Sequence, residues 1–353
     1  MTAKAFVALV TCFNDDETLN LDATRTQVRR QVQAGNHIMC AGTNGDFSAL
    51  TFDEKIALTE AVVDEVAGRA QVIVNAGMPA TFDTLKLARG FDRIGVDGIA
   101  VITPYFIACT QDGLIRHFST VADGVGTPVY LYDIPARTQN RIEPATAAAP
   151  ADHGNIAGIK NSGGGQDTLE DYLAIWTARP DFAVYSGPDH LVHWSLMHGA
   201  AGRISGLGNV MPDTLAAILA AHNAGDHAEA ERQQDIFGRF RKDLYALGYP
   251  PRAGQAGAVF DGQLGRCQPP ACAVAGPGTG RGDPADPAQR RPSGVTTGGA
   301  GPRVRPLGTR GAGQDRPSVP RTAPHGLGAG PPSAPCPSCC AATRPPRSPA
   351  WAA

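Results

Sequence analysis

Eight short apolar segments, rich in β-branched residues, alternate with longer segments of helical period along the first 250 residues. Each is almost continuously apolar rather than alternating, which is typical of parallel strands that helices cover on both faces. The predicted strands span residues 5–10, 37–41, 71–75, 98–102, 128–132, 156–160, 182–186 and 202–205.

The segments between these strands have the pattern of amphipathic helices. In residues 52–67, Ile56, Leu58, Val62 and Val66 recur on one side, and the remaining positions carry most of the acidic residues. The other predicted helices span residues 84–94, 111–124, 168–177, 212–224 and 227–247, of which the last is long and highly charged, as a final outer helix would be.

Eight strand-helix units in this length favour a (β/α)₈ TIM barrel over a doubly wound sheet. No Gly-x-Gly-x-x-Gly motif follows the first strand, so the dinucleotide-binding alternative lacks its fingerprint.

The composition changes abruptly near Pro250. Residues 1–250 carry 19 Lys and Arg against 29 Asp and Glu, whereas residues 251–353 carry 12 Arg against 4 Asp and contain 19 of the 29 prolines and 18 of the 42 glycines. Such a composition without a period is typical of disorder. We therefore predict two regions, a catalytic barrel over residues 1–250 and a low-complexity, disordered tail over residues 251–353.

The sequence of the tail suggests three interpretations. The cluster Cys336-Pro-Ser-Cys339-Cys340 resembles half a zinc site, but the second pair of ligands is absent. An arginine-rich RNA-binding arm would interleave aromatic residues with the arginines, and the tail shows no such interleaving and no repeat. The hypothesis that explains most is a shifted reading frame after about residue 251, because Ala, Gly, Pro and Arg have GC-rich codons. Resequencing the gene tests it.

Several protein classes are excluded by the first 250 residues. No apolar run reaches the roughly 18 residues that a membrane helix needs, and the N-terminus lacks a signal-peptide pattern. The net charge of −10 argues against a nucleic-acid partner, and only three cysteines lie in this region. We expect a cytoplasmic location.

Lys160 is the strongest candidate for chemistry. It ends the sixth predicted strand, after Ile156-Ala157-Gly158-Ile159, and barrel enzymes place their chemistry at the carboxyl ends of the strands. Desolvation at such a position generally favours the neutral amine, which attacks ketones to form an iminium, an electron sink. Tyr132 ends the adjacent strand, and its phenol would transfer protons. Alternatively, each residue has a purely structural role.

Three other groups at strand ends carry weaker signals. The turn Gly42-Thr43-Asn44-Gly45 offers backbone N–H groups and a hydroxyl for a carboxylate, although Gly and Asn also mark ordinary turns. Gly163-Gly164-Gly165 is interpreted as a flexible loop, and Asp189-His190 as a structural pair rather than metal ligands. We expect no metal and no cofactor.

Together these segments resemble the dihydrodipicolinate synthase / N-acetylneuraminate lyase family of Schiff-base class I aldolases. The matching stretches occur in the family's order across about residues 5–250, with Lys160 placed 28 positions after Tyr132: GTNGDFSALTFDEK, GVDGIAVITPYF, PVYLYDIPARTQNRI, IAGIKNSGG and YSGPDHLVHWSLMHGAAGRISGLGNV.

The resemblance implies roles for individual residues. Lys160 would form the imine with pyruvate, Tyr132 would be the catalytic phenol, and Thr43 would hold the carboxylate end of pyruvate. The implied substrate-binding residues are Gly42, Asn44, Arg137, Gly187 and Ile204. The expected partners are pyruvate and an aldehyde.

Departures from the family pattern leave the aldehyde open. Asn44 replaces a second threonine of the synthases, Asp46-Phe47 replaces Glu-Ser, and Phe106 stands where a tyrosine completes a proton relay across a subunit interface. These changes resemble the branch that acts on 2-keto-3-deoxy sugar acids. Arg137, however, matches the arginine that binds aspartate semialdehyde in 4-hydroxy-tetrahydrodipicolinate synthases. A third alternative is a non-catalytic or inactive barrel.

The resemblance also implies a homotetramer and a small helical domain after the barrel. The predicted tail occupies that place, so we expect the last barrel helix to expose an apolar face and the chain to fold or assemble poorly.

Overall fold

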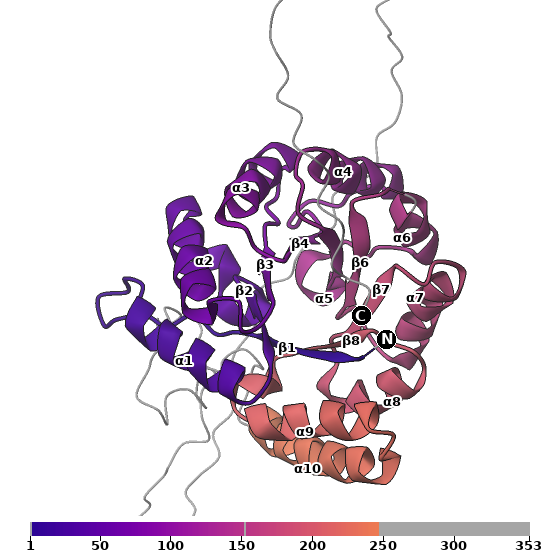
Figure 1. The fold of residues 1–353 in the computed structure, drawn as a ribbon. Helices are drawn as coiled ribbons and strands as arrows, with labels where there is room; N and C mark the ends of the chain where they lie inside the picture. Colours follow the sequence, from indigo (N-terminus) through magenta and orange to yellow (C-terminus); the bar gives the residue numbers. More distant parts are fainter. Residues whose placement is uncertain (1, 152, 247–353) are drawn as a thin grey trace, which may run out of the picture. The chain divides into compact units, whose positions relative to one another are not determined.

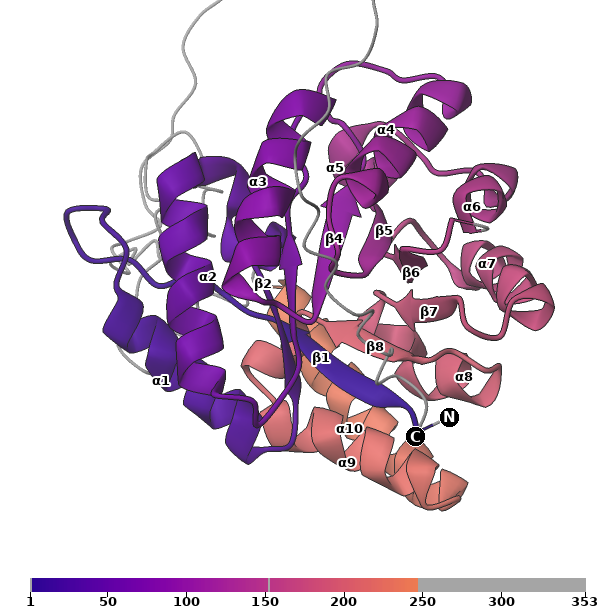
Figure 2. The same cartoon turned by 45° about the horizontal axis from the view of Figure 1, so that its top comes forward.

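The eight strands form a closed barrel in which every strand is parallel to its neighbours (Figures 1 and 2). The computed structural model describes residues 2–151 and 153–246, so the predicted tail over residues 251–353 lies outside the described residues. The strands follow one another around the barrel in chain order, and β8 pairs with β1. They are β1 (Lys4–Ala8), β2 (His37–Cys40), β3 (Val72–Asn75), β4 (Gly98–Ile102), β5 (Val129–Asp133), β6 (Ile156–Asn161), β7 (Ala183–Ser186) and β8 (Gly202–Ser205). The predicted (β/α)₈ barrel is confirmed.

Apart from the short α5, which lies within the outline of the ring in this view, the helices surround the strands (Figure 1). They are α1 (Leu21–Gln33), α2 (Phe52–Val66), α3 (Thr81–Ile94), α4 (Gln111–Asp123), α5 (Pro135–Thr138), α6 (Pro144–Ala151), α7 (Gln166–Ala178), α8 (Val192–Met197), α9 (Pro212–Asn223) and α10 (His227–Ala246). Short 3₁₀ turns follow three strands: η1 (Thr43–Gly45) and η2 (Phe47–Ala49) after β2, η3 (Asp189–Leu191) after β7 and η4 (Leu207–Asn209) after β8. Within the described residues, no helix combines the length and apolar character needed to cross a bilayer.

Helix α1 lies in a segment for which the apolar pattern predicts no helix. Its buried positions include Thr24, Gln27 and Gln31 as well as Ala23 and Val28, so its inner face is largely polar. The Gln31 side chain donates a hydrogen bond to the Gly208 carbonyl, 3.0 Å away. A buried face made largely of polar residues leaves no apolar periodicity for the sequence to reveal.

Apolar side chains pack in two layers. One layer lies between the strands and the helices, and the other fills the inside of the barrel. Inside the barrel, Tyr185 packs edge-on against Phe6 and against Tyr130, with ring centroids 5.5 Å and 5.9 Å apart. Tyr130 precedes Tyr132 by two positions and therefore faces the same way along β5. This aromatic cluster is part of the packed interior, and the cavity described below opens at the carboxyl ends of the strands.

Helix α10 does more than form an outer layer. It packs on α9, α8 and η3, and its Phe237 side chain is fully buried. Leu244 in its last turn lines the cavity described below, which corrects the expectation of a purely outer helix. On the same helix Ile236 and Phe240, four positions apart, are 41% and 36% exposed.

Candidate active site

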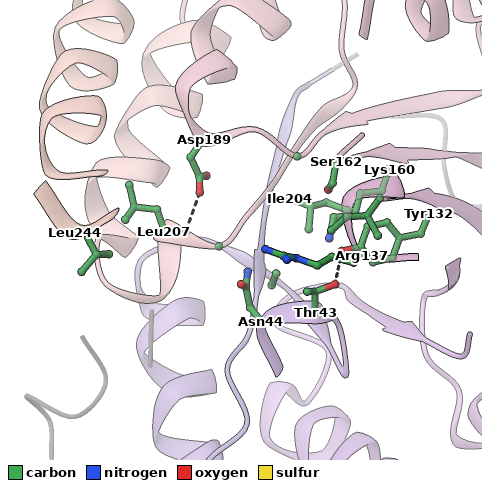
Figure 3. Close-up of a pocket in the computed structure, with 14 residues that line it drawn as sticks. Thr43, Asn44, Tyr132, Arg137, Lys160, Ser162, Asp189, Ile204, Leu207 and Leu244 are labelled. Atoms are coloured by element: carbon green, nitrogen blue, oxygen red, sulfur yellow. Dashed lines mark hydrogen bonds between the residues drawn. The ribbon is translucent and has the colours of Figure 1, made fainter. Parts of the chain in front are cut away.

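A cavity of about 150 Å³ opens at the carboxyl ends of the strands (Figure 3). Its polar lining residues are Thr43, Asn44, Tyr132, Arg137, Lys160, Ser162 and Asp189. The remaining lining residues are Ala8, Ile134, Gly187, Ile204, Gly206, Leu207 and Leu244. An engineered cavity of this size holds benzene, a molecule of six heavy atoms, which is also the number in pyruvate.

Lys160 projects into this cavity from β6 with only 4% of its surface exposed. Its Nζ lies 3.5 Å from the Met39 sulfur and 3.9 Å from the centroid of the Tyr132 ring. No carboxylate contacts Nζ in an ion pair among the described residues. The amine is therefore held inside the barrel against the Met39 sulfur and the Tyr132 ring.

Tyr132 stands beside Lys160 because the register of β5 and β6 pairs the two residues. The phenol is 1% exposed, and its oxygen lies 2.9 Å from the Thr43 hydroxyl. Strand neighbours with the same register point to the same face of a sheet, so both side chains enter the barrel together. The structure brings together the three residues predicted to be catalytic.

The loop after β2 fixes Thr43. The Thr11 hydroxyl donates to the Gly45 carbonyl at 2.7 Å, and a side chain at Gly45 would lie 2.8 Å from the Leu9 carbonyl oxygen. Ala41 and Asp46, on either side, have φ angles of 50° and 52°, in a region that non-glycine residues rarely adopt. This tightly constrained turn directs Thr43 and Asn44 into the cavity.

Gly42 does not line the cavity, unlike the other predicted binding residues. It is buried between β2 and η1, where its carbonyl accepts hydrogen bonds from the backbone of Gly45 and Phe47. Gly187 and Ile204 lie on the wall formed by β7 and β8. Asn44 packs closely against the same wall. A Cβ atom added at Gly206 would lie 2.4 Å from the Asn44 amide nitrogen.

Arg137 and Phe106 differ in their relation to the cavity. Arg137 lies on the short helix α5, lines the cavity and is exposed at its mouth (Figure 3). Phe106 is 85% exposed, has a φ of 78° and does not line the cavity. Phe106, at the position where a tyrosine would complete a proton relay, therefore lies outside the cavity of its own chain.

Ser162 and Leu244 also line the cavity, but the sequence gives a reason to expect only the first of them. Ser162 follows Lys160 by two positions, and residues i and i+2 of an extended chain point to the same face, so this hydroxyl was predictable. Leu244 lies 84 positions after Lys160 on a highly charged helix, and nothing in its local sequence marks it.

Asp189 forms a buried ion pair that the sequence analysis did not identify. Its carboxylate is 4% exposed and contacts the guanidinium of Arg203, which is fully buried in β8. The interpretation of Asp189 as structural agrees with this pairing, but its partner is Arg203 rather than His190. A lone arginine inside an apolar strand needs an acidic partner, and that signal could have identified the pair.

Asp133 is a second buried carboxyl group next to the site. It follows Tyr132, is 0% exposed, and accepts a hydrogen bond from the Ile142 backbone at 2.9 Å through one oxygen. Its other oxygen has no hydrogen-bond partner. Burial raises the pKa of Asp133 to about 6, against the smaller lowering effect of the Ile142 hydrogen bond.

A closed parallel barrel with a buried lysine, a facing phenol and a small cavity at the strand ends has the features of a Schiff-base lyase. The family model of the dihydrodipicolinate synthetase family matches residues 1–271, so the chain belongs to this family and is a lyase. The match continues past residue 250, where the composition changes.

Individual relatives agree with this assignment. The chain is 35% identical to an uncharacterized DapA-like lyase of Halobacterium salinarum, over 67% of this chain and 77% of that protein. It is 34% identical to a 4-hydroxy-tetrahydrodipicolinate synthase of Geobacter metallireducens, over 66% of this chain and 79% of the relative. Among solved structures, the family member YagE of E. coli K12, crystallised with pyruvate, superimposes with a TM-score of 0.72 at 29% identity, covering 76% of this chain and 92% of YagE.

Proposed function

We propose that this protein is a pyruvate-dependent class I aldolase that reversibly cleaves a 2-keto-3-deoxy acid to pyruvate and an aldehyde. The observation that carries the proposal is the placement of Lys160, buried in the cavity with its amine against the Tyr132 ring. The pyruvate complex of YagE supports the choice of keto acid. The homotetramer stays a prediction of the family resemblance.

In the first half of the reaction, the Lys160 amine attacks the C2 carbonyl of the keto acid. The carbonyl oxygen leaves as water, after proton transfers that Tyr132 performs, and a C=N bond replaces the C=O bond. Thr43 holds the phenol through the 2.9 Å hydrogen bond and is placed to bind the carboxylate end of the substrate.

In the second half, a base removes the proton of the C4 hydroxyl and the C3–C4 bond breaks. Its electron pair moves into the iminium to give an enamine, and the aldehyde leaves. Protonation of C3 and hydrolysis of the imine release pyruvate and restore the amine. The reaction as a whole needs no oxidant or reductant. Tyr132, whose ring contacts the Lys160 amine, is placed to carry the protons.

One observation favours a second candidate, 4-hydroxy-tetrahydrodipicolinate synthase. Arg137 lines the mouth of the cavity, where a guanidinium would bind an aldehyde that carries a carboxylate, such as aspartate semialdehyde. The synthases among the relatives support the same reading. The absence of a tyrosine at Phe106 favours the aldolase.

Borohydride trapping tests the shared chemistry. Pyruvate and borohydride together are expected to attach a lactyl-type mass to Lys160, and Lys160→Ala is expected to abolish it. Lys55 provides the matched control, because it is also buried, at 2% exposure, but contacts Met78 outside the cavity. Lys55→Met is expected to keep the label. A folded wild-type protein that acquires no label contradicts the proposal and favours a non-catalytic barrel.

A further inference from the structure

The wall of the cavity opposite Tyr132 is held by a buried charge network that the proposed chemistry does not use. Arg203 in β8 is 0% exposed, and its guanidinium donates to the Ser186 hydroxyl at 3.1 Å and to the Gly187 carbonyl at 2.6 Å. It also forms the ion pair with Asp189. One side chain thus bridges the end of β7, the turn η3 and β8.

Asp189 extends this network to the loop after β8. One carboxylate oxygen accepts a hydrogen bond from the Ser205 hydroxyl at 2.6 Å, and the other accepts from the Leu207 backbone N–H at 3.1 Å (Figure 3). The Ser205 hydroxyl in turn accepts from the Gly208 N–H at 3.0 Å. The first two residues of η4, Leu207 and Gly208, are therefore tied to the same carboxylate, directly or through Ser205.

The residues held in this way are cavity residues. Gly187 is bound by Arg203, and Leu207 is bound by Asp189, while Ile204 lies between Arg203 and Ser205 on β8. Because η3 and η4 are short turns, their positions depend on these hydrogen bonds more than on regular secondary structure.

The Arg203–Asp189 ion pair also determines the charge of the cavity wall. Asp189 is the only carboxylate among the described residues that line the cavity, and the substrate of the proposed reaction is itself an anion. An uncompensated carboxylate in this wall would repel a keto acid, and the adjacent guanidinium offsets that charge.

We infer that Arg203 is a positioning residue for the keto acid. Through Asp189, Gly187 and Ser186 it fixes the β7–β8 wall and neutralises the one carboxylate there, so that the cavity accepts a carboxylate substrate next to Lys160. The inference rests on the proposed function and assigns part of its substrate binding to a residue that contacts no substrate.

The test measures the pyruvate concentration that gives half-maximal borohydride labelling of Lys160, together with the limiting extent of labelling and the melting temperature. Arg203→Met is expected to raise that concentration on the order of 100-fold. The substitution both displaces the β7–β8 wall and leaves the Asp189 carboxylate without its guanidinium partner. The limiting extent at saturating pyruvate is expected to stay unchanged, because Lys160, Tyr132 and Thr43 belong to other strands. Arg203→Lys, which keeps the charge but not the planar fork, is expected to fall between wild type and Arg203→Met.

A double variant separates positioning from folding. Breaking a buried pair by removing one partner strongly destabilises proteins, whereas apolar replacement of both partners is often tolerated. The double variant Arg203→Met/Asp189→Leu is therefore expected to melt near the wild-type temperature and still require about tenfold more pyruvate. A double variant that melts normally and has wild-type half-saturation overturns the inference.

Arg30 supplies the matched control. Its guanidinium donates to the carbonyl oxygens of Asn209 and Val210, so it anchors the far side of the same loop through two residues that do not line the cavity. Arg30→Met is expected to stay within about twofold of wild type, and an increase equal to that of Arg203→Met overturns the inference. A wild-type protein that acquires no label overturns the proposed function and this inference together, whereas the outcomes above overturn this inference alone.

Discussion

The Thr43 hydroxyl and the Tyr132 phenol lie 2.9 Å apart in a partly buried hydrogen bond that joins residues 89 positions apart in the chain. Tyr132 also faces Lys160 through the register of β5 and β6. Thr43 therefore contacts the phenol oxygen, and the Lys160 Nζ lies 3.9 Å from the centroid of the same ring, so the three side chains form one continuous path of contacts inside the barrel.

This path predicts unequal effects of removing its hydroxyls. Tyr132→Phe is expected to lower the rate of imine formation by about 10²- to 10⁴-fold, the range for loss of a positioned proton-transfer group. Thr43→Val is expected to have a smaller effect, and Thr43→Ser, which keeps the hydroxyl, should recover most of the rate. The amount of labelled Lys160 at successive times after mixing with pyruvate and borohydride measures these rates. Equal rates for Thr43→Val and Thr43→Ser would contradict a role for the hydroxyl.

Arg137 is expected to distinguish between aldehydes. If the aldehyde substrate carries a carboxylate, Arg137→Ala should raise the KM for aspartate semialdehyde by at least about tenfold, because a charge-assisted hydrogen bond is lost. The KM for pyruvate should stay close to the wild-type value. For 2-keto-3-deoxygluconate cleavage the same variant should have a smaller effect. Arg141→Ala is the control, because Arg141 lies four positions further and does not line the cavity. Equal effects of the two substitutions would remove the basis for the synthase assignment.

Gly187 is expected to tolerate no side chain. An added Cβ would lie 2.2 Å from the Ser162 Oγ and 2.5 Å from the Asn161 carbonyl oxygen, and the second contact is with backbone that cannot move freely. Gly187→Ala is therefore expected to destabilise the protein by about 1–3 kcal/mol and to weaken pyruvate binding. Gly165→Ala is the control, since its Cβ would meet nothing within 4 Å. Urea unfolding and half-maximal labelling measure both effects, and similar values for the two variants would disprove close packing at Gly187.

Asp133 predicts a pH-dependent difference in stability. Its pKa is raised from 3.8 to about 6 by burial, so between these values the folded protein retains a proton that the unfolded chain has lost. The free energy of unfolding that this carboxyl group contributes is fully present below about pH 4 and is lost as the pH rises through about 6. A shift of this size corresponds to about 3 kcal/mol.

Asp133→Asn removes this titration. Relative to wild type, the variant should gain stability between about pH 4 and pH 6 and show a constant difference above that range. Urea unfolding at a series of pH values measures the difference curve. A curve that is flat across this interval would show that the carboxyl group is ionised at the same pH in the folded and unfolded states.

The eight strands were predictable because buried parallel strands consist of continuous apolar runs, and β4 and β8 coincide with their predicted ranges. Helix α1 was not predictable, since Thr24, Gln27 and Gln31 occupy its buried face. The same limit applies to Leu244, whose contact with the cavity depends on how α10 packs against α9 and η3.

The sequence by itself determined the strand-helix alternation and the candidates at the strand ends, because hydrophobic periodicity and the position of a residue within a strand are local properties. Only the tertiary structure decided which candidates meet. The strand register places Tyr132 beside Lys160, and the closure of β8 onto β1 brings Asn44 against Gly206. The pairing of Arg203 with Asp189 likewise depends on β8 lying beside β7 and the turn η3 that follows it, since a buried charge selects its partner by distance in space and not by distance along the chain.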